Sequence, residues 1–169
     1  NGKNRYEAIA DVDEAIDFIR YYSKEMERNK GFVVQTKNAN SNEVSKSLMK
    51  PYGVWAVISP FNFPFAILAG MSIAVIVTGN AVVLKPASDT PIIGSLFAEI
   101  LKEAGLPDGV LNLVTGSGSK IGKVIVASRD VAGIVFTGSK MVGHRIMEDS
   151  GKVIPRPVIA ELGGKNPVI

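Results

Sequence analysis

From Pro51 onwards, short strand-like runs alternate with longer helix-like runs, and this alternation limits the possible fold more than any other feature of the sequence. The strand-like runs are nearly continuous in apolar residues, as in strands buried on both faces, and Gly or Pro stands at most junctions. Strands are expected over residues 52–59, 81–85, 110–115, 132–136 and 158–162, with helices over 65–78, 91–104, 121–128 and 140–148. Such alternation forms right-handed βαβ units, so the sequence predicts an α/β fold with an open parallel sheet.

Residues 1–50 follow a different pattern. An amphipathic helix is expected over residues 6–28, because four apolar residues recur there at helical spacing between charged ones, namely Ile9, Val12, Ile16 and Ile19. Residues 29–50 are polar and rich in turn-forming residues, which predicts a connector with short strands or a hairpin. We therefore expect a helical and connector region over residues 1–50 and an incomplete sheet domain over residues 51–169, the chain being a piece of a longer protein.

The composition argues against several classes of partner and site. The 19 Lys and Arg residues exceed the 16 Asp and Glu residues by only three and are spread along the chain, which disfavours nucleic-acid binding. The chain has no Cys and a single His, which excludes disulfides, thiolate metal sites and thiol catalysis within it, so no metal site is expected. The most apolar stretch, residues 65–77, is too short to span a bilayer, and the N-terminus resembles no signal peptide, so we expect a cytoplasmic protein without a membrane partner.

Three loops are expected at the carboxyl ends of the strands, where parallel sheets bind ligands. The loop from Gly116 to Gly122 completes neither G-x-G-x-x-G nor the Walker pattern, so it is either a nucleotide-binding loop or a plain turn. Ser139 opens a helix and can act as an N-cap, or its loop can hold a phosphate. Lys85 ends a strand, where it can bond a ribose or a phosphate, or remain solvated.

Taken together, these loops belong to a set of motifs that occur in one order along residues 51–167, about two-thirds of the chain. The motifs are Pro60-Phe61-Asn62-Phe63-Pro64, Lys85-Pro86-Ala87-Ser88, Gly105-Leu106-Pro107, Gly116-Ser117-Gly118, Phe136-Thr137-Gly138-Ser139 and Glu161-Leu162-Gly163-Gly164-Lys165-Asn166-Pro167. The ordered set resembles the aldehyde dehydrogenase superfamily, which implies a Rossmann-like NAD(P)-binding domain. Residues 13–22 and 51–58 are similar to its Δ1-pyrroline-5-carboxylate dehydrogenase branch, which oxidises glutamate semialdehyde to glutamate in proline breakdown and is sometimes fused to a proline dehydrogenase.

The resemblance implies roles for two catalytic residues. In the family a cysteine thiolate attacks the aldehyde, hydride passes to the nicotinamide, and water hydrolyses the resulting thioester. Asn62 is then expected to donate its amide N–H to the oxyanion, and Glu161 to activate the water as general base. Without the resemblance, Asn62 could be a loop-closing side chain and Glu161 a surface residue at a strand end.

The resemblance also implies a dinucleotide site. Its expected residues are Ile58, Ser59, Pro60, Phe61, Lys85, Ser88, Gly118, Gly122, Phe136, Gly138, Ser139, Val142 and Gly163. Lys85 would bond the adenosine ribose and Ser139 the pyrophosphate, while Gly163 would permit close approach of the nicotinamide. Many NAD-preferring relatives carry Glu where this chain has Ser88, so NAD is the expected cofactor and NADP remains possible.

Two other functions remain open at the level of sequence. An acyl-phosphate reductase relative would share the fold, although Glu161 disfavours it because such an enzyme needs no deacylating base. A non-catalytic NAD(P)-binding protein would lack the cysteine that an aldehyde dehydrogenase carries downstream of this segment. The leading hypothesis is a piece of a homo-oligomeric aldehyde dehydrogenase acting on a small aldehyde in the cytoplasm, or in the mitochondrial matrix of a eukaryote.

Overall fold

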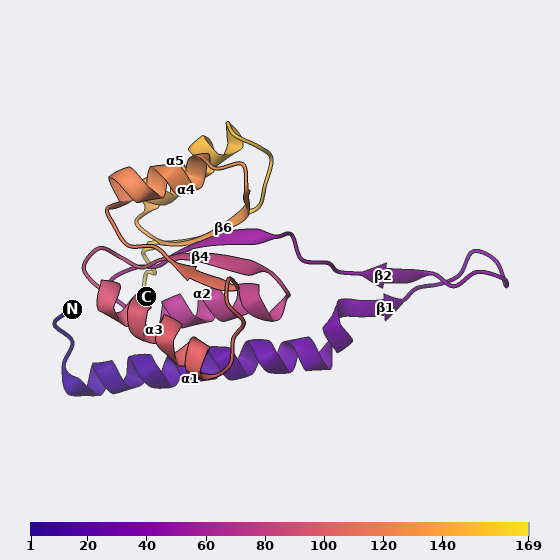
Figure 1. The fold of residues 1–169 in the computed structure, drawn as a ribbon, viewed down its shortest axis with the longest axis horizontal. Coiled ribbons are helices and arrows are strands. Elements are labelled where there is room, and N and C mark those ends of the chain that lie inside the picture. The colour runs from indigo at the N-terminus through magenta and orange to yellow at the C-terminus, as the bar shows by residue number, and fades with distance from the viewer. Residues whose placement is uncertain (169) are drawn as a thin grey trace.

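The computed structural model describes residues 1–168 and contains a five-stranded parallel sheet in the order β5-β4-β3-β6-β7 (Figure 1). The strands are β3 (Val54–Ile58), β4 (Ala81–Lys85), β5 (Leu111–Leu113), β6 (Val131–Gly138) and β7 (Val158–Leu162). Strands β4 and β5 follow β3 in the sequence and lie on one side of it, and β6 and β7 lie on its other side. The predicted α/β fold with an open parallel sheet is confirmed, and its strand order reverses between β3 and β6.

Helices cover both faces of the sheet. On one face, α2 (Ala66–Val77) and α3 (Pro91–Glu103) pack through Leu68 and Phe97 onto Trp55 and Val57 of β3. On the other face, α4 (Lys123–Ala127) and α5 (Lys140–Gly151) share a core with Ala56, the β3 residue between those two. Side chains alternate across a strand, so the continuous apolar run of β3 supplies both cores.

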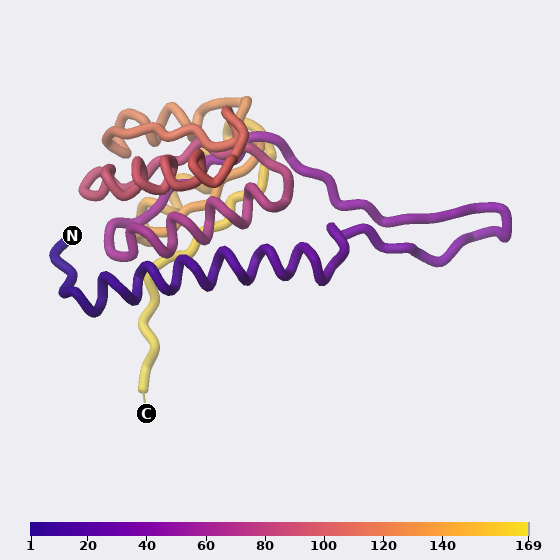
Figure 2. Tube along the Cα trace, turned by 60° about the horizontal axis from the view of Figure 1, so that its bottom comes forward, coloured from indigo at the N-terminus to yellow at the C-terminus, as the bar shows by residue number. Residues whose placement is uncertain are grey.

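The long N-terminal helix α1 (Arg5–Arg28) lies along α2 as an outer layer (Figure 2). Asn4 caps it: the Asn4 side chain accepts from the Glu7 N–H at 2.9 Å, and the Glu7 carboxylate accepts from the Asn4 N–H at 3.2 Å. The helix was predicted correctly, but the expected apolar stripe does not face the core: Ile9 and Val12 are 53% and 44% exposed. Asp11 and Ala15 are buried instead.

Close packing explains this choice of face. A Cβ on Gly70 of α2 would lie 2.9 Å from Cδ2 of Phe18, so the small residues Ala15 and Gly70 let α1 and α2 approach until the Phe18 ring fits between them. Bulky Ile residues on that face would hold the two helices apart.

The connector over residues 29–50 is a hairpin, which was one of the two structures expected for it. A short 3-10 turn (Lys30–Phe32) leads into β1 (Val33–Gln35), which pairs antiparallel with β2 (Lys46–Leu48). The hairpin projects far from the sheet domain in both views (Figures 1 and 2). All six of its strand residues are exposed.

Several element boundaries differ from expectation, and the two largest differences in kind concern α4 and β6. The expected helix over residues 121–128 is a π turn (Gly118–Gly122) followed by the short α4. Strand β6 continues beyond the expected residue 136, because Thr137 and Gly138 pair with Glu161 and Leu162 of β7. Within residues 1–168, no helix is long and apolar enough to cross a membrane, and no cluster of three or more His, Asp or Glu side chains could hold a metal.

Candidate cofactor-binding and catalytic site

The carboxyl ends of four strands are in register across the sheet. Lys85 of β4 pairs with Ile58 of β3, Ile58 with Phe136 of β6, and Phe136 with Ala160 of β7. The loops that carry Asn62, Ser139 and Gly163, and the loop that begins after Lys85, follow the carboxyl ends of these four strands. The predicted site residues are therefore brought to one edge of the sheet, where the strand order reverses and ligands bind in such folds.

A cleft of about 370 Å³ opens on the α4–α5 side of this edge. Six of the expected dinucleotide residues line it, namely Ile58, Lys85, Gly118, Gly122, Phe136 and Val142. The π turn, α4 and α5 form its walls, so the Gly116–Gly122 loop reaches the site through the turn that follows β5.

Lys85 is the buried cationic residue among those that line this cleft. The residue is only 4% exposed, and its Nζ donates a hydrogen bond to the Pro86 carbonyl at 3.0 Å. Burial lowers the pKa of Lys85, because removing an ammonium from water disfavours its charged form. The buried position of Lys85 contradicts the solvated interpretation, and the ribose or phosphate role stays a prediction.

The glycines of the π turn leave room for a ligand. A Cβ added to Gly118 or Gly122 would meet no atom within 4 Å, so both residues border open space rather than packed protein. Side chains there would project into the cleft. The cleft thus combines a buried cation with close access to backbone, which suits the adenosine end of a dinucleotide.

Of the two interpretations of the loop before α5, the N-cap is confirmed, and the phosphate site stays a prediction. The Ser139 hydroxyl accepts a hydrogen bond from the Val142 N–H at 3.4 Å, so Ser139 is an N-cap. Val142, in the first turn of α5, lines the cleft, and the first turn of a helix has N–H groups without an intrahelical partner. Gly138 has a packing role, because a Cβ there would lie 2.6 Å from Cζ of Phe136.

Other expected cofactor residues lie outside the cleft lining. Ser59 and Pro60 are buried, whereas Phe61 is 57% exposed and Gly163 is also exposed. The exposed Ser88 donates through its hydroxyl to the Gly116 carbonyl at 3.4 Å, which links the loop after β4 to the loop after β5.

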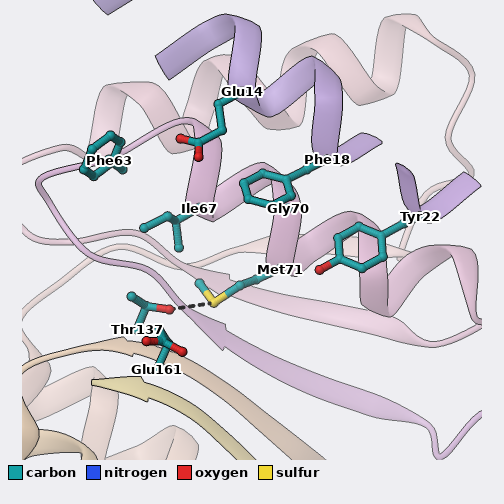
Figure 3. Close-up of a pocket in the computed structure, with 9 residues that line it drawn as sticks. All are labelled: Glu14, Phe18, Tyr22, Phe63, Ile67, Gly70, Met71, Thr137 and Glu161. Atoms are coloured by element: carbon teal, nitrogen blue, oxygen red, sulfur yellow. Dashed lines mark hydrogen bonds between the residues drawn. The ribbon is translucent and has the colours of Figure 1, made fainter. Parts of the chain in front are cut away.

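A second pocket, of about 430 Å³, lies on the α1–α2 side of the same edge (Figure 3). Glu14, Phe18 and Tyr22 of α1 point toward α2, and Thr137 and Glu161 close the pocket from the sheet. The Thr137 hydroxyl donates to Sδ of Met71 on α2 at 3.4 Å. Sequence reasoning missed these α1 residues, although Phe18 and Tyr22 stand four apart on one helical face.

Glu161 lines this second pocket but is exposed. It shares a face of the edge strand β7 with Ile159, which is 58% exposed, while Leu162 packs on the opposite face against Gly143 of α5. Within residues 1–168, Glu161 thus stands on the exposed side of an edge strand, at the border of the second pocket.

Asn62 lies in the exposed loop between β3 and α2 and does not line either pocket. Its neighbour Phe63 does line the second pocket. The loop places Asn62 on the same edge of the sheet as Glu161, and the described residues do not bring the two side chains into contact.

Comparisons with known proteins agree with this geometry. The aldehyde dehydrogenase family matches residues 1–169. The 1-pyrroline-5-carboxylate dehydrogenase of Geobacillus thermodenitrificans is 48% identical over 99% of this chain and 33% of its own length. A crystal structure of a proline utilization A mutant from Bradyrhizobium japonicum superposes with a TM-score of 0.91 and 41% identity, covering 96% of this chain and 17% of that one.

An Escherichia coli enzyme described as NADP dependent has a TM-score of 0.89 and 34% identity, over 97% of this chain and 34% of that one. The chain thus spans about a third of the length of the curated relatives that it matches. With its whole length matched by the family, the chain belongs to the aldehyde dehydrogenase family.

Proposed function

We propose that this chain is the cofactor-binding part of an enzyme that oxidises L-glutamate semialdehyde to glutamate with NAD(P). The observation that carries the proposal is the row Lys85, Ile58, Phe136 and Ala160, with a glycine-walled cleft on one side and the Glu161 pocket on the other. The domain with the cysteine nucleophile belongs, on this proposal, to the two-thirds of the protein that the relatives have beyond this segment.

The proposed reaction consumes an aldehyde, water and oxidised cofactor, and yields a carboxylate, reduced cofactor and protons. A thiolate outside this chain adds to the aldehyde carbon, that carbon loses a hydride, and water then releases the acid. A bound nicotinamide dinucleotide supplies the hydride acceptor. Asn62 donates an amide N–H to the oxyanion, and it suits this role because an amide has no titration of its own near neutrality. Glu161 accepts a proton from the water.

For the cofactor, Lys85 would bond the adenosine ribose, and the first turn of α5 the pyrophosphate. The open space beside Gly118 and Gly122 would take the adenine end. We propose NAD as the cofactor. Ser88 carries no negative charge that would repel a 2′-phosphate, and one structural relative is described as NADP dependent, so the preference is open to test.

The substrate proposal rests on two supports. The relatives 48% identical to this chain are named 1-pyrroline-5-carboxylate dehydrogenases. The pocket beside Glu161 is small and mostly apolar, with Phe18, Tyr22 and Met71 in its walls, which suits a short aliphatic aldehyde.

Kinetics of the full-length enzyme test the proposal. We expect kcat/KM for glutamate semialdehyde to exceed that for acetaldehyde and for hexanal, with lower KM for NAD than for NADP. The 169-residue chain alone should oxidise none of these three aldehydes, because it has no cysteine. Equal kcat/KM for all three aldehydes would overturn the substrate, a large NADP preference would overturn the cofactor, and turnover by the isolated chain would overturn the mechanism.

We also propose that the full-length enzyme is a homo-oligomer. The β1–β2 hairpin supports this, since it projects from the body and exposes Val34 and Leu48 by 55% and 53% (Figure 1). A two-stranded hairpin is at best marginally stable alone, so a partner surface would stabilise it. The cytoplasmic location stays a prediction.

A further inference from the structure

The loop that carries Asn62 is held mainly by contacts with the N-terminal segment. Pro60 and Pro64 have no backbone N–H, and the three residues between them, Phe61, Asn62 and Phe63, are all exposed. Helix α2 begins directly after this loop, and its N-cap residue Phe65 makes no side-chain capping bond. The buried Pro60 and Pro64 anchor the two ends of the loop, whereas neither burial nor local capping fixes the three residues between them.

Asp11 supplies the missing cap from the other helix. Its carboxylate accepts a hydrogen bond from the Ala66 N–H at 3.0 Å and another from the Phe65 N–H at 3.4 Å. These bonds span 54 and 55 residues of sequence, and Asp11 is only 5% exposed. A carboxylate at a helix N-terminus satisfies orphan N–H groups and is stabilised by the helix dipole.

Lys3 and Asn1 extend the same support along the loop. The Lys3 ammonium lies 3.6 Å from the Asp11 carboxylate and 3.9 Å from the centroid of the Phe63 ring. The Asn1 side-chain amide donates to the Phe61 carbonyl at 3.1 Å. The residues on both sides of Asn62 are thus contacted by the N-terminal segment, and Asp11 is the group that ties this segment to α2.

We propose that Asp11 is a positioning residue for Asn62: it holds the start of α2, and with it the Pro60–Pro64 loop, where the Asn62 amide meets the reacting oxygen. The inference rests on the proposed oxyanion role of Asn62. Asp11 touches neither substrate nor cofactor and acts only through the loop. A small displacement of a catalytic group is enough to slow a reaction strongly.

The test is a double-mutant cycle in the full-length enzyme with Asp11→Ala and Asn62→Ala. Loss of the oxyanion donor should lower kcat about 100-fold. Asp11→Ala should lower kcat about 10-fold, with KM for NAD within about twofold of wild type, since Lys85 and the α4–α5 walls are unchanged. In the Asn62→Ala background, Asp11→Ala should have no further effect on kcat, because the group that it positions is gone.

Two further variants separate positioning from general damage. Asp13 is exposed on the same helix, so Asp13→Ala should leave kcat unchanged. Asp11→Asn keeps an acceptor oxygen but loses the charge, and should lower kcat by about threefold, since charge-assisted bonds are roughly twice as strong as neutral ones. If Asp11→Ala fails to fold, Asp11→Asn completes the same cycle, and an unchanged kcat in it overturns the inference.

The outcomes keep the two proposals apart. If Asn62→Ala retains full kcat, the oxyanion role fails and the positioning inference with it. If Asn62→Ala slows the reaction but the Asp11 variants do not, only the positioning inference fails. If Asp11→Ala slows wild type and the Asn62→Ala enzyme by the same factor, Asp11 acts independently of Asn62 and the inference is overturned.

Discussion

At the scale of single residues, the burial of Lys85 is expected to favour cofactor binding at the expense of the stability of the folded protein. Its ammonium is removed from water with one carbonyl, that of Pro86, as hydrogen-bond acceptor. A buried charge without a carboxylate partner is costly. We expect Lys85→Met in the full-length enzyme to leave the thermal midpoint of the cofactor-free protein unchanged or higher, while raising KM for NAD about 10-fold, the equivalent of ~1.4 kcal/mol.

The pH dependence of stability gives the same prediction a second measurement. Because burial lowers the pKa of Lys85 in the folded state, the unfolded chain binds more protons between that pKa and the ordinary value of 10.5. Stability of the wild type relative to Lys85→Met should therefore rise as pH increases toward 10.5. Lys120 is exposed outside the cleft, so Lys120→Met is the control, and a wild-type KM for NAD in Lys85→Met would refute the prediction.

Part of the proposed site could be predicted from sequence motifs, and part could not. Lys85, Gly118, Gly122 and Val142 line one cleft, because each motif follows a strand and parallel strands end at one edge. The role of Asp11 could not be predicted from the sequence. An acidic residue on an amphipathic helix is expected to be solvated, and the helix N-terminus that Asp11 caps lies 54 residues away in the sequence.

At the scale of elements, Arg156 joins three of them. Its guanidinium donates to the Ser128 carbonyl and to the Val131 carbonyl, each at 2.6 Å, and also to the Val126 carbonyl. Its Nε donates to the Ser150 hydroxyl at 2.8 Å. The C-terminus of α4, the start of β6 and the last turn of α5 are thus tied to the segment before β7, and these two helices wall the cofactor cleft.

Arg156→Met should destabilise the full-length protein by about 2–4 kcal/mol, since it leaves carbonyls at the end of a helix without their charged donor. Arg156→Lys should recover only part of this loss, because an ammonium cannot reproduce the guanidinium fork. Thermal unfolding measures the total, and amide hydrogen exchange should show lost protection confined to α4, α5 and the start of β6. Arg129→Met, at an exposed position, is the control; equal midpoints for the Arg156 and Arg129 variants would contradict this prediction.

Element types followed from the sequence, whereas the buried face of α1 did not. Periodicity identifies a helix that has two kinds of face, but the face that meets the protein is set by fit to a neighbour. Here the fit of Phe18 against Gly70 outweighed the burial of Ile9 and Val12. The extension of β6 was missed for a similar reason, since Thr137 and Gly138 are strand residues only because β7 pairs with them.

At the scale of the whole molecule, two of the exposed apolar surfaces lie on elements that border the second pocket. One is the α1 stripe that includes Ile9, Val12 and Ile16, and the other is the face of β7 that carries Ile159 and Glu161. Both lie on elements next to the second pocket, where the proposed catalytic domain would sit. On this proposal, the catalytic domain would cover the exposed face of β7 and partly bury Glu161.

The projecting hairpin yields the last prediction, which concerns assembly. Its strands expose apolar side chains and unpaired edges, features that soluble proteins usually cover. If β1 and β2 form a subunit contact, the double change Val34→Lys and Leu48→Lys places charges in that contact. The full-length enzyme should then dissociate to smaller species, which light scattering coupled to size-exclusion chromatography would measure.

The control for this change is Ile92→Lys, at a position 72% exposed on α3, which should leave the mass unchanged. An unaltered mass for the hairpin variant would show that the hairpin is not required for assembly. Because the hairpin projects away from the sheet and no hairpin residue lines the cleft, dissociation should leave KM for NAD unchanged, which separates loss of assembly from loss of the cofactor site (Figure 1).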